Sequence, residues 1–345
     1  MADQVCRNFE LGKLTRDPER ALGGHANVAW RFDTDRGSFF VKDFKCDDAD
    51  LEGSIPRLER GFRELEQPLA QRGPASGVKV PTPVPVPGEN RAISEIDGKY
   101  FRVHEWVDAR PLTQVPLTPE VSERVGRTLA GIHRVAPAGE VKPNNLPFTE
   151  DRWHAIADRV QPRAPEAAGL IHENASLLSR VHHATYQPTP PGPVVFTHGD
   201  LQHPGNMLKL DDGSIAIIDW DRADNIAASY EAVEAAGGLA VTKDNVVNQK
   251  RFLAGIRGYI DGGGYPIPPQ REIFGNWVDK WARWAEHHTE LFRFDDEPHK
   301  FNSESCRSTV QRTINLFESI ERGHRSWLDE IQGLNSNAPT AGPMS

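Results

Sequence analysis

Alternating apolar and polar residues mark strands in the first third of the chain. Residues 28–32 and 38–42 show the period of two that is typical of a half-buried strand, and a turn signal separates them. Residues 91–96 and 99–107 flank Asp97-Gly98, a dipeptide that favours a tight hairpin turn. Together with a further strand earlier in this region, they lead us to expect five strands before the helical part begins.

Helical spacing accompanies and then replaces this alternation. Apolar residues at steps of four, three and four predict one helix among the strands: Leu58, Phe62, Leu65 and Leu69. Further along, Thr118 is placed to cap a helix that starts with Pro119. Two helices are expected within residues 149–185, and several within residues 226–333.

A β-rich segment followed by a helical one is the layout of an α+β protein. We expect a first lobe over residues 1–107, with one main helix, and a helical lobe over residues 108–333. Residues 334–345 are small and polar with Pro and Gly, so a disordered tail is expected there.

Composition limits the classes of partner and the cellular compartment that are expected for the protein. The formal net charge of −9 argues against a nucleic-acid partner and is compatible with a cationic small molecule. No apolar run is long enough for a membrane span, and the first residues lack the basic and apolar regions of a signal peptide. Cys6, Cys46 and Cys306 are scattered and odd in number, so a reduced, cytoplasmic protein is expected, with no membrane partner.

One segment concentrates side chains that can carry chemistry. The apolar strand 194–197 leads into His198-Gly199-Asp200, and Asn206 follows on the next stretch. Two short strands around a turn then return the chain to Asp219, so that Asn206 and Asp219 are expected at one end of a hairpin. Phosphoryl transfer from a nucleotide needs such a set, namely one acid to orient a hydroxyl and an amide and a second acid to bind Mg²⁺.

The order His-Gly-Asp-Leu…Asn…Ile-Asp-Trp closely resembles that of the aminoglycoside phosphotransferase and choline kinase family. These are small-molecule kinases with a protein-kinase-like, two-lobe fold. The resemblance implies that Asp200 orients the acceptor hydroxyl and that Asn206 and Asp219 bind Mg²⁺. It also implies ATP or GTP as phosphate donor, and a role for His198 in holding its loop by hydrogen bonding.

The catalytic loop departs from the kinase pattern in length. Asn206 lies six residues after Asp200, whereas the kinase pattern has five, so an extra residue falls within 202–205. Gly205 could absorb an irregular turn at this point.

Lys42 ends a strand at the position where a kinase lysine reaches the nucleotide phosphates. Such a lysine pairs with a glutamate of the following helix, for which we select Glu59, with Glu64 and Glu66 as alternatives. Gly23 and Gly24 lie in a connection that could cover the phosphates, although the spaced glycine pattern of kinases is absent.

The remaining candidates rest on their position in the resemblance. The backbone of Glu105 and Val107 is expected to hydrogen-bond an adenine ring. Asp221, Glu286 and Trp281 are candidates for contact with the acceptor, with core packing, helix capping or solvation as the alternatives.

These residues predict a nucleotide-dependent O-phosphotransferase acting on a small, hydroxylated molecule. An aminoglycoside-like antibiotic is favoured as acceptor, which would connect the protein to antibiotic resistance. Choline, homoserine or another amino alcohol is the alternative. A pseudokinase that binds nucleotide without turnover, and a ligand-binding protein without nucleotide, are the rival classes.

Overall fold

The computed structural model describes residues 1–21, 27–44, 48–73, 77–294 and 302–337. The chain divides into two compact units, and each unit combines segments that are far apart in the sequence. The first unit contains residues 1–116, 131–139 and 195–225, and the second contains residues 117–130, 140–194 and 226–345. The lobe boundary at residue 107 stays a prediction.

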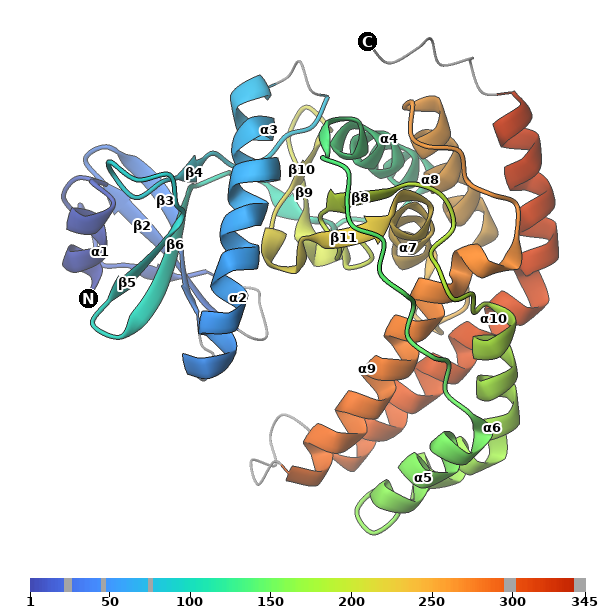
Figure 1. Cartoon of the computed structure of the whole chain (residues 1–345). Helices are drawn as coiled ribbons and strands as arrows, with labels where there is room; N and C mark the ends of the chain where they lie inside the picture. The colour runs from blue at the N-terminus through green and yellow to red at the C-terminus, as the bar shows by residue number, and fades with distance from the viewer. Residues whose placement is uncertain (22–26, 45–47, 74–76, 295–301, 338–345) are drawn as a thin grey trace. The chain divides into compact units, whose positions relative to one another are not determined.

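The first unit is built on an antiparallel sheet in the order β1-β2-β3-β6-β4, with β5 also paired to β6. Strands β2 to β6 of this sheet are labelled in Figure 1. Its strands are β1 (Glu19–Arg20), β2 (Val28–Thr34), β3 (Gly37–Phe44), β4 (Pro83–Val84), β5 (Ile93–Ile96) and β6 (Lys99–Glu105). The long strands and the hairpin at Asp97-Gly98 are where the alternation of apolar residues predicts them. A helix that the sequence did not signal, α1 (Ala2–Asn8), packs Val5 and Cys6 against Phe32 and Phe101 of this sheet.

One helical segment follows β3 and changes its winding along its length. It consists of α2 (Asp48–Gly61), the π-helical turn η1 (Phe62–Glu66) and α3 (Gln67–Arg72). Leu58, Phe62, Leu65 and Leu69, which predicted this helix, are all buried. Pro68 lacks a backbone N–H and crowds the carbonyl four residues earlier, which accounts for the widened turn before it.

A second, smaller sheet of the first unit has the order β10-β9-β7. Its strands are β7 (Arg110–Pro111), β9 (Met207–Lys209) and β10 (Ile215–Ile217), and β9 pairs with β10 as the predicted hairpin. Short 3₁₀ turns complete this region: η3 (Leu112–Gln114), η4 (Pro204–Asn206) and η5 (Trp220–Arg222). β8 (Val194–Thr197) pairs with β11 (Asp224–Ala227) in a separate two-stranded sheet.

Helices make up the second unit. They are α5 (Glu150–Val160), α6 (Pro165–Ala184), α7 (Ala228–Ala240), α8 (Gln249–Asp261), η6 (Arg271–Phe274), α9 (Gly275–Phe294) and α10 (Ser303–Ser336), with most of α4 (Pro119–Val135). Thr118 caps α4 by accepting a hydrogen bond from the amide of Val121, as predicted. Within the unit α5 packs on α6, α6 on α10, and α7 on α8. The α+β class predicted from the sequence is confirmed.

The end of α10 corrects one prediction. Residues 334–336, which were assigned to a disordered tail, continue the helix. Leu334 keeps the apolar spacing set by Trp327 and Ile331, and the Asn335 side chain donates a hydrogen bond of 2.7 Å to the Ile267 carbonyl. Among the residues that the structure describes, no helix has the length and apolarity needed to cross a bilayer.

Candidate active site

The loop after β8 and the loop after β10 are joined through the ring of His198. Its Nδ1 accepts a hydrogen bond of 3.2 Å from the backbone amide of Asp200, so its Nε2 carries the proton and lies 2.9 Å from the Ile218 carbonyl oxygen. The ring is fully buried and packs against the indole of Trp220, with ring centroids 4.8 Å apart. His198 therefore holds the backbone on which Asp200 and Asp219 are mounted, in line with its predicted structural role.

The extra loop residue is absorbed without separating Asp200 from Asn206. Residues 204–206 form the 3₁₀ turn η4, and the Asn206 amide donates to the His203 carbonyl. The Asn206 side-chain Nδ2 then donates to the Asp200 carbonyl oxygen at 3.0 Å and to its carboxylate Oδ2 at 3.1 Å. With Nδ2 used in this way, Oδ1 is the atom of Asn206 that could face a cation.

The two glycines of the loop have different roles, and the irregular turn predicted at Gly205 is not found there. Gly199 has φ of +80°, a conformation that glycine adopts without strain, and so allows the sharp turn into Asp200. At Gly205 φ is not positive, and a Cβ there would lie 2.7 Å from the His203 ring. Close packing of the ring, and not an unusual backbone angle, explains the glycine at 205.

Asp219 sits at a strained point of the backbone directly after β10. Its φ and ψ are +66° and +62°, the left-handed region that residues other than glycine rarely adopt. The preceding Ile218 is fixed on both sides, because its amide donates to the Asn206 carbonyl and its carbonyl faces His198. The hairpin thus returns Asp219 beside Asn206, as the sequence predicts.

Lys42 is held by two carboxylates of the loop that follows β10. Its Nζ lies 2.7 Å from Asp219 Oδ1 and 2.5 Å from Asp221 Oδ2. Burial alone would lower the pKa of Lys42, but Asp221 and Asp219 raise it above its ordinary value. Burial likewise would raise the pKa of Asp219, but the Lys42 ammonium and the Arg102 guanidinium hold it below its usual range. The lysine and the Asp219 carboxylate are therefore both charged at neutral pH.

The predicted partner of Lys42 on the following helix is corrected by the structure. Glu59 is buried and accepts hydrogen bonds of 2.8–3.1 Å from the backbone amides of Ala92 and Ile93. Its carboxylate ties the helix to the start of β5, and no contact between Glu59 and Lys42 is found in the described part of the chain. Gly23 and Gly24, the two glycines that were predicted to cover the phosphates, lie outside the described residues.

A buried ion-pair network that the sequence did not reveal lies next to Lys42. Arg102 of β6 is 2% exposed and pairs with Glu66 of η1, which also accepts from His104 at 2.7 Å. Burial would raise the pKa of Glu66, but Arg102 and His104 hold it below its ordinary value. In the strand pattern Arg102 alternates with Phe101 and Val103, which is typical of a solvent-facing position, so no signal distinguished it.

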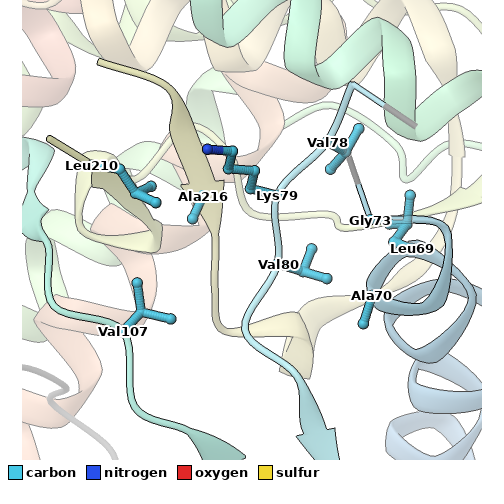
Figure 2. A pocket seen from close by; sticks show the side chains of 9 residues that line it. All are labelled: Leu69, Ala70, Gly73, Val78, Lys79, Val80, Val107, Leu210 and Ala216. Carbon is cyan, nitrogen blue, oxygen red and sulfur yellow. The ribbon is translucent and has the colours of Figure 1, made fainter. Parts of the chain in front are cut away.

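The first unit contains an apolar cavity of about 220 Å³, which lies between the end of α3 and the β9–β10 hairpin (Figure 2). Apolar side chains dominate its wall: Leu69, Val78, Val80, Val107, Leu210 and Ala216. Val107, whose backbone is predicted to hydrogen-bond adenine, lines this cavity, and an apolar pocket is what a nucleobase requires. Glu105 donates its amide to the Thr82 carbonyl at 2.8 Å, so its carbonyl is the group that could contact a base.

The candidates on α9 belong to the second unit and have other partners there. Glu286 forms a two-point ion pair with Arg152, at 2.7 and 3.1 Å. Trp281 is half-buried, with the Arg312 guanidinium 5.6 Å from its ring centroid. The aromatic row passes from a buried Trp277 to a Trp284 that is 48% exposed, so core packing accounts for its first member only. Contact of these residues with an acceptor stays a prediction.

Residues 18–259 match the model of the Phosphotransferase enzyme family, which is more than half of the chain. The chain belongs to this family. No curated protein matches it. Membership makes this protein a phosphotransferase enzyme, and the family match together with the fold supports a kinase that acts on hydroxyl groups of small molecules.

Solved structures share this fold at low sequence identity. A spectinomycin phosphotransferase, APH(9)-Ia, in complex with ADP and spectinomycin is 14% identical, with a TM-score of 0.60, over 93% of this chain and 98% of that one. An aminoglycoside phosphotransferase from Alicyclobacillus acidocaldarius is 13% identical, with a TM-score of 0.61, over 96% and 97% of the two chains. A microcompartment-associated aminopropanol kinase is 15% identical, with a TM-score of 0.55, over 95% and 98%.

Proposed function

We propose that this protein transfers the terminal phosphate of ATP to a hydroxyl of a small, amine-bearing molecule, with Mg²⁺ as cofactor. The observation that carries the proposal is the local arrangement in the first unit. There His198 and Asn206 hold Asp200, and Lys42 lies against Asp219.

Each residue has a role that its contacts support. Asp200 orients the acceptor hydroxyl and takes its proton. Asn206 Nδ2 holds the Asp200 carboxylate from one side for this task. Lys42 steadies the phosphates of the donor. The apolar cavity at Val107 receives the adenine ring, with the Glu105 carbonyl as hydrogen-bond acceptor.

The donor atoms fit a magnesium ion. Asp219 would hold the ion through its carboxylate and Asn206 through Oδ1, and such oxygen ligands are the ones that Mg²⁺ prefers. When bound, the ion would neutralise charge on the phosphates.

Two classes of acceptor are supported, and the first is favoured. An aminoglycoside-like antibiotic agrees with the fold shared with the spectinomycin enzyme, which would make the protein a resistance factor. An amino alcohol is the second candidate, because the aminopropanol kinase aligns over nearly the whole of both chains. A pseudokinase is disfavoured, since the longer loop still brings Asn206 to Asp200.

The test is a screen for ADP release from MgATP with aminoglycosides, other antibiotics and amino alcohols as acceptors. The matched variant is Asp200→Ala, which removes the carboxylate but leaves the nucleotide pocket intact. We expect it to bind MgATP with wild-type affinity and to lose at least about 100-fold in turnover. Near-wild-type turnover by this variant would exclude Asp200 as the catalytic acid–base group.

A further inference from the structure

The usual lysine partner in a kinase is a glutamate on the helix after the lysine strand, and all three candidates here are bound to other groups. Glu59 accepts from backbone amides of Ala92 and Ile93. Glu64 forms an ion pair of 2.8 Å with Arg60, one helical turn before it. The third, Glu66, pairs with Arg102 and His104. A different residue must therefore hold Lys42 when Asp219 turns to a metal ion.

Besides Asp219, the carboxylate of Asp221 contacts Lys42. Lys42 of β3 and Arg102 of β6 lie directly opposite each other in the sheet, so two positive side chains are cross-strand neighbours. Like charges in this position repel. Asp221 bridges them, with Oδ2 at 2.5 Å from Lys42 Nζ and Oδ1 at 3.6 Å from an Arg102 guanidinium nitrogen.

Asp221 is itself fixed from two sides. Its backbone carbonyl accepts a hydrogen bond from the Arg57 guanidinium of α2, and its carboxylate faces Arg102. Arg102 cannot swing away easily, because it is buried and paired with the equally buried Glu66. The carboxylate is therefore held where it meets Lys42, and α2 is connected to the loop after β10.

The charges of this network also balance without Asp219. Lys42 and Arg102 are positive, and Asp221 and Glu66 are negative. A buried ion pair that loses one partner is strongly destabilised, so a lysine held only by Asp219 would be left alone when Asp219 binds a cation. With Asp221 in place, the Asp219 carboxylate can turn to Mg²⁺ while Lys42 keeps an anionic partner.

We propose that Asp221, held by Arg102 and Arg57, is the positioning residue for Lys42 and takes the place of the helix glutamate. This rests on the proposed kinase function. Asp221 acts through Lys42, which in turn meets the nucleotide phosphates. The prediction that Asp221 contacts the acceptor is replaced by this role.

A double-mutant cycle on nucleotide affinity tests the proposal without any acceptor. The dissociation constant of MgATP is measured by calorimetry for wild type, Asp221→Asn, Lys42→Met and the double variant. We expect Asp221→Asn to weaken binding by about 10- to 100-fold, the usual effect of losing a partner that orients a ligand group. In the Lys42→Met background the same substitution should weaken binding by less than about twofold, because residues that act through each other are not additive.

The control is Glu59→Gln, which should leave MgATP affinity within about twofold of wild type and add independently to Lys42→Met. Should Asp221→Asn fail to fold, Asp221→Glu keeps the charge but displaces it, and the same non-additivity with Lys42→Met is expected. The coupling should persist for ATP without Mg²⁺.

Several outcomes would overturn the role of Asp221. These are additive effects of Asp221→Asn and Lys42→Met, a coupling of Lys42 to Glu59 instead, or a coupling seen only with Mg²⁺, which would make Asp221 a metal ligand. If wild type itself fails to bind MgATP, the proposed kinase function falls instead.

Discussion

Glu234 is a buried acid in the second unit whose ionisation should be visible in the stability of the fold. It lies on α7, and its carboxylate meets the Asn276 amide and, at 2.5 Å, the Lys280 ammonium. Burial raises the pKa of Glu234 to about 7, Lys280 offsets part of this effect, and the neighbouring Glu231 adds to it. The folded state therefore keeps a proton that the unfolded chain releases near pH 4.5.

Because of this difference, we expect the contribution of Glu234 to the free energy of unfolding to fall as pH rises from about 4.5 to about 7. Above pH 7 the contribution should stay constant. The shift corresponds to about 3 kcal/mol, at about 1.4 kcal/mol per pKa unit. The measurement is the free energy of unfolding of wild type minus that of Glu234→Gln, from urea titrations at pH 5 to 8. The difference should fall between pH 5 and about 7 and then level off, and a curve that is flat or rising below pH 7 would show that Glu234 ionises normally.

Single residues differ in how far the sequence reveals them. Asp200, Asn206 and Lys42 can be selected as candidates from the sequence because their order along the chain, with strands before them, is itself a pattern. Arg102 was not found, because its environment depends on Glu66 and on a loop more than a hundred residues away. The partner of Lys42 was mispredicted for the same reason, since spacing along a helix gives several glutamates and not their contacts.

Helices α4 and α8 cross closely because glycines face each other at the crossing. A Cβ at Gly258 would overlap the backbone carbonyl of Glu123, and one at Gly126 would lie 2.7 Å from the Tyr259 amide nitrogen. Neither neighbour is a flexible side chain that could move aside. The second unit thus depends on small residues at these two positions.

We predict that Gly258→Ala lowers the free energy of unfolding by about 1–3 kcal/mol, the usual cost of overpacking a core. The control is Gly169→Ala on α6, where a Cβ would meet nothing within 4 Å. Because alanine favours a helix interior over glycine, this variant should gain about 0.5–1 kcal/mol. Urea unfolding of both variants gives the comparison, and equal effects of the two substitutions would argue against a tight crossing.

Elements were predictable where a local period defines them. The paired strands β2 and β3, the hairpin at Asp97-Gly98 and the helix with Leu58 follow from apolar spacing. The π-helical turn before Pro68 and the helix α1 were not foreseen. A change in winding depends on how the chain accommodates a missing N–H, and a seven-residue helix is too short to show a period.

For the molecule as a whole, fold and reaction class follow from the sequence far better than the acceptor does. The motif of the catalytic loops is short and lies within residues 198–220, so it can be recognised in the sequence itself. The acceptor candidates come from a helix whose aromatic row changes from buried at Trp277 to exposed at Trp284. Spacing alone does not separate these positions, so contact of Glu286 and Trp281 with an acceptor stays a prediction.

The most direct test of the central claim is the effect of Mg²⁺ on ATP binding by wild type and by Asp219→Ala, measured by calorimetry with and without the metal. Asp219 follows β10 in a strained conformation beside Asn206 and Lys42. A carboxylate would be needed at this place to bind the metal ion. We predict that Mg²⁺ tightens ATP binding to wild type by at least about tenfold and leaves the affinity of Asp219→Ala unchanged. An equal gain in affinity with Mg²⁺ for both proteins would contradict the assignment of this site.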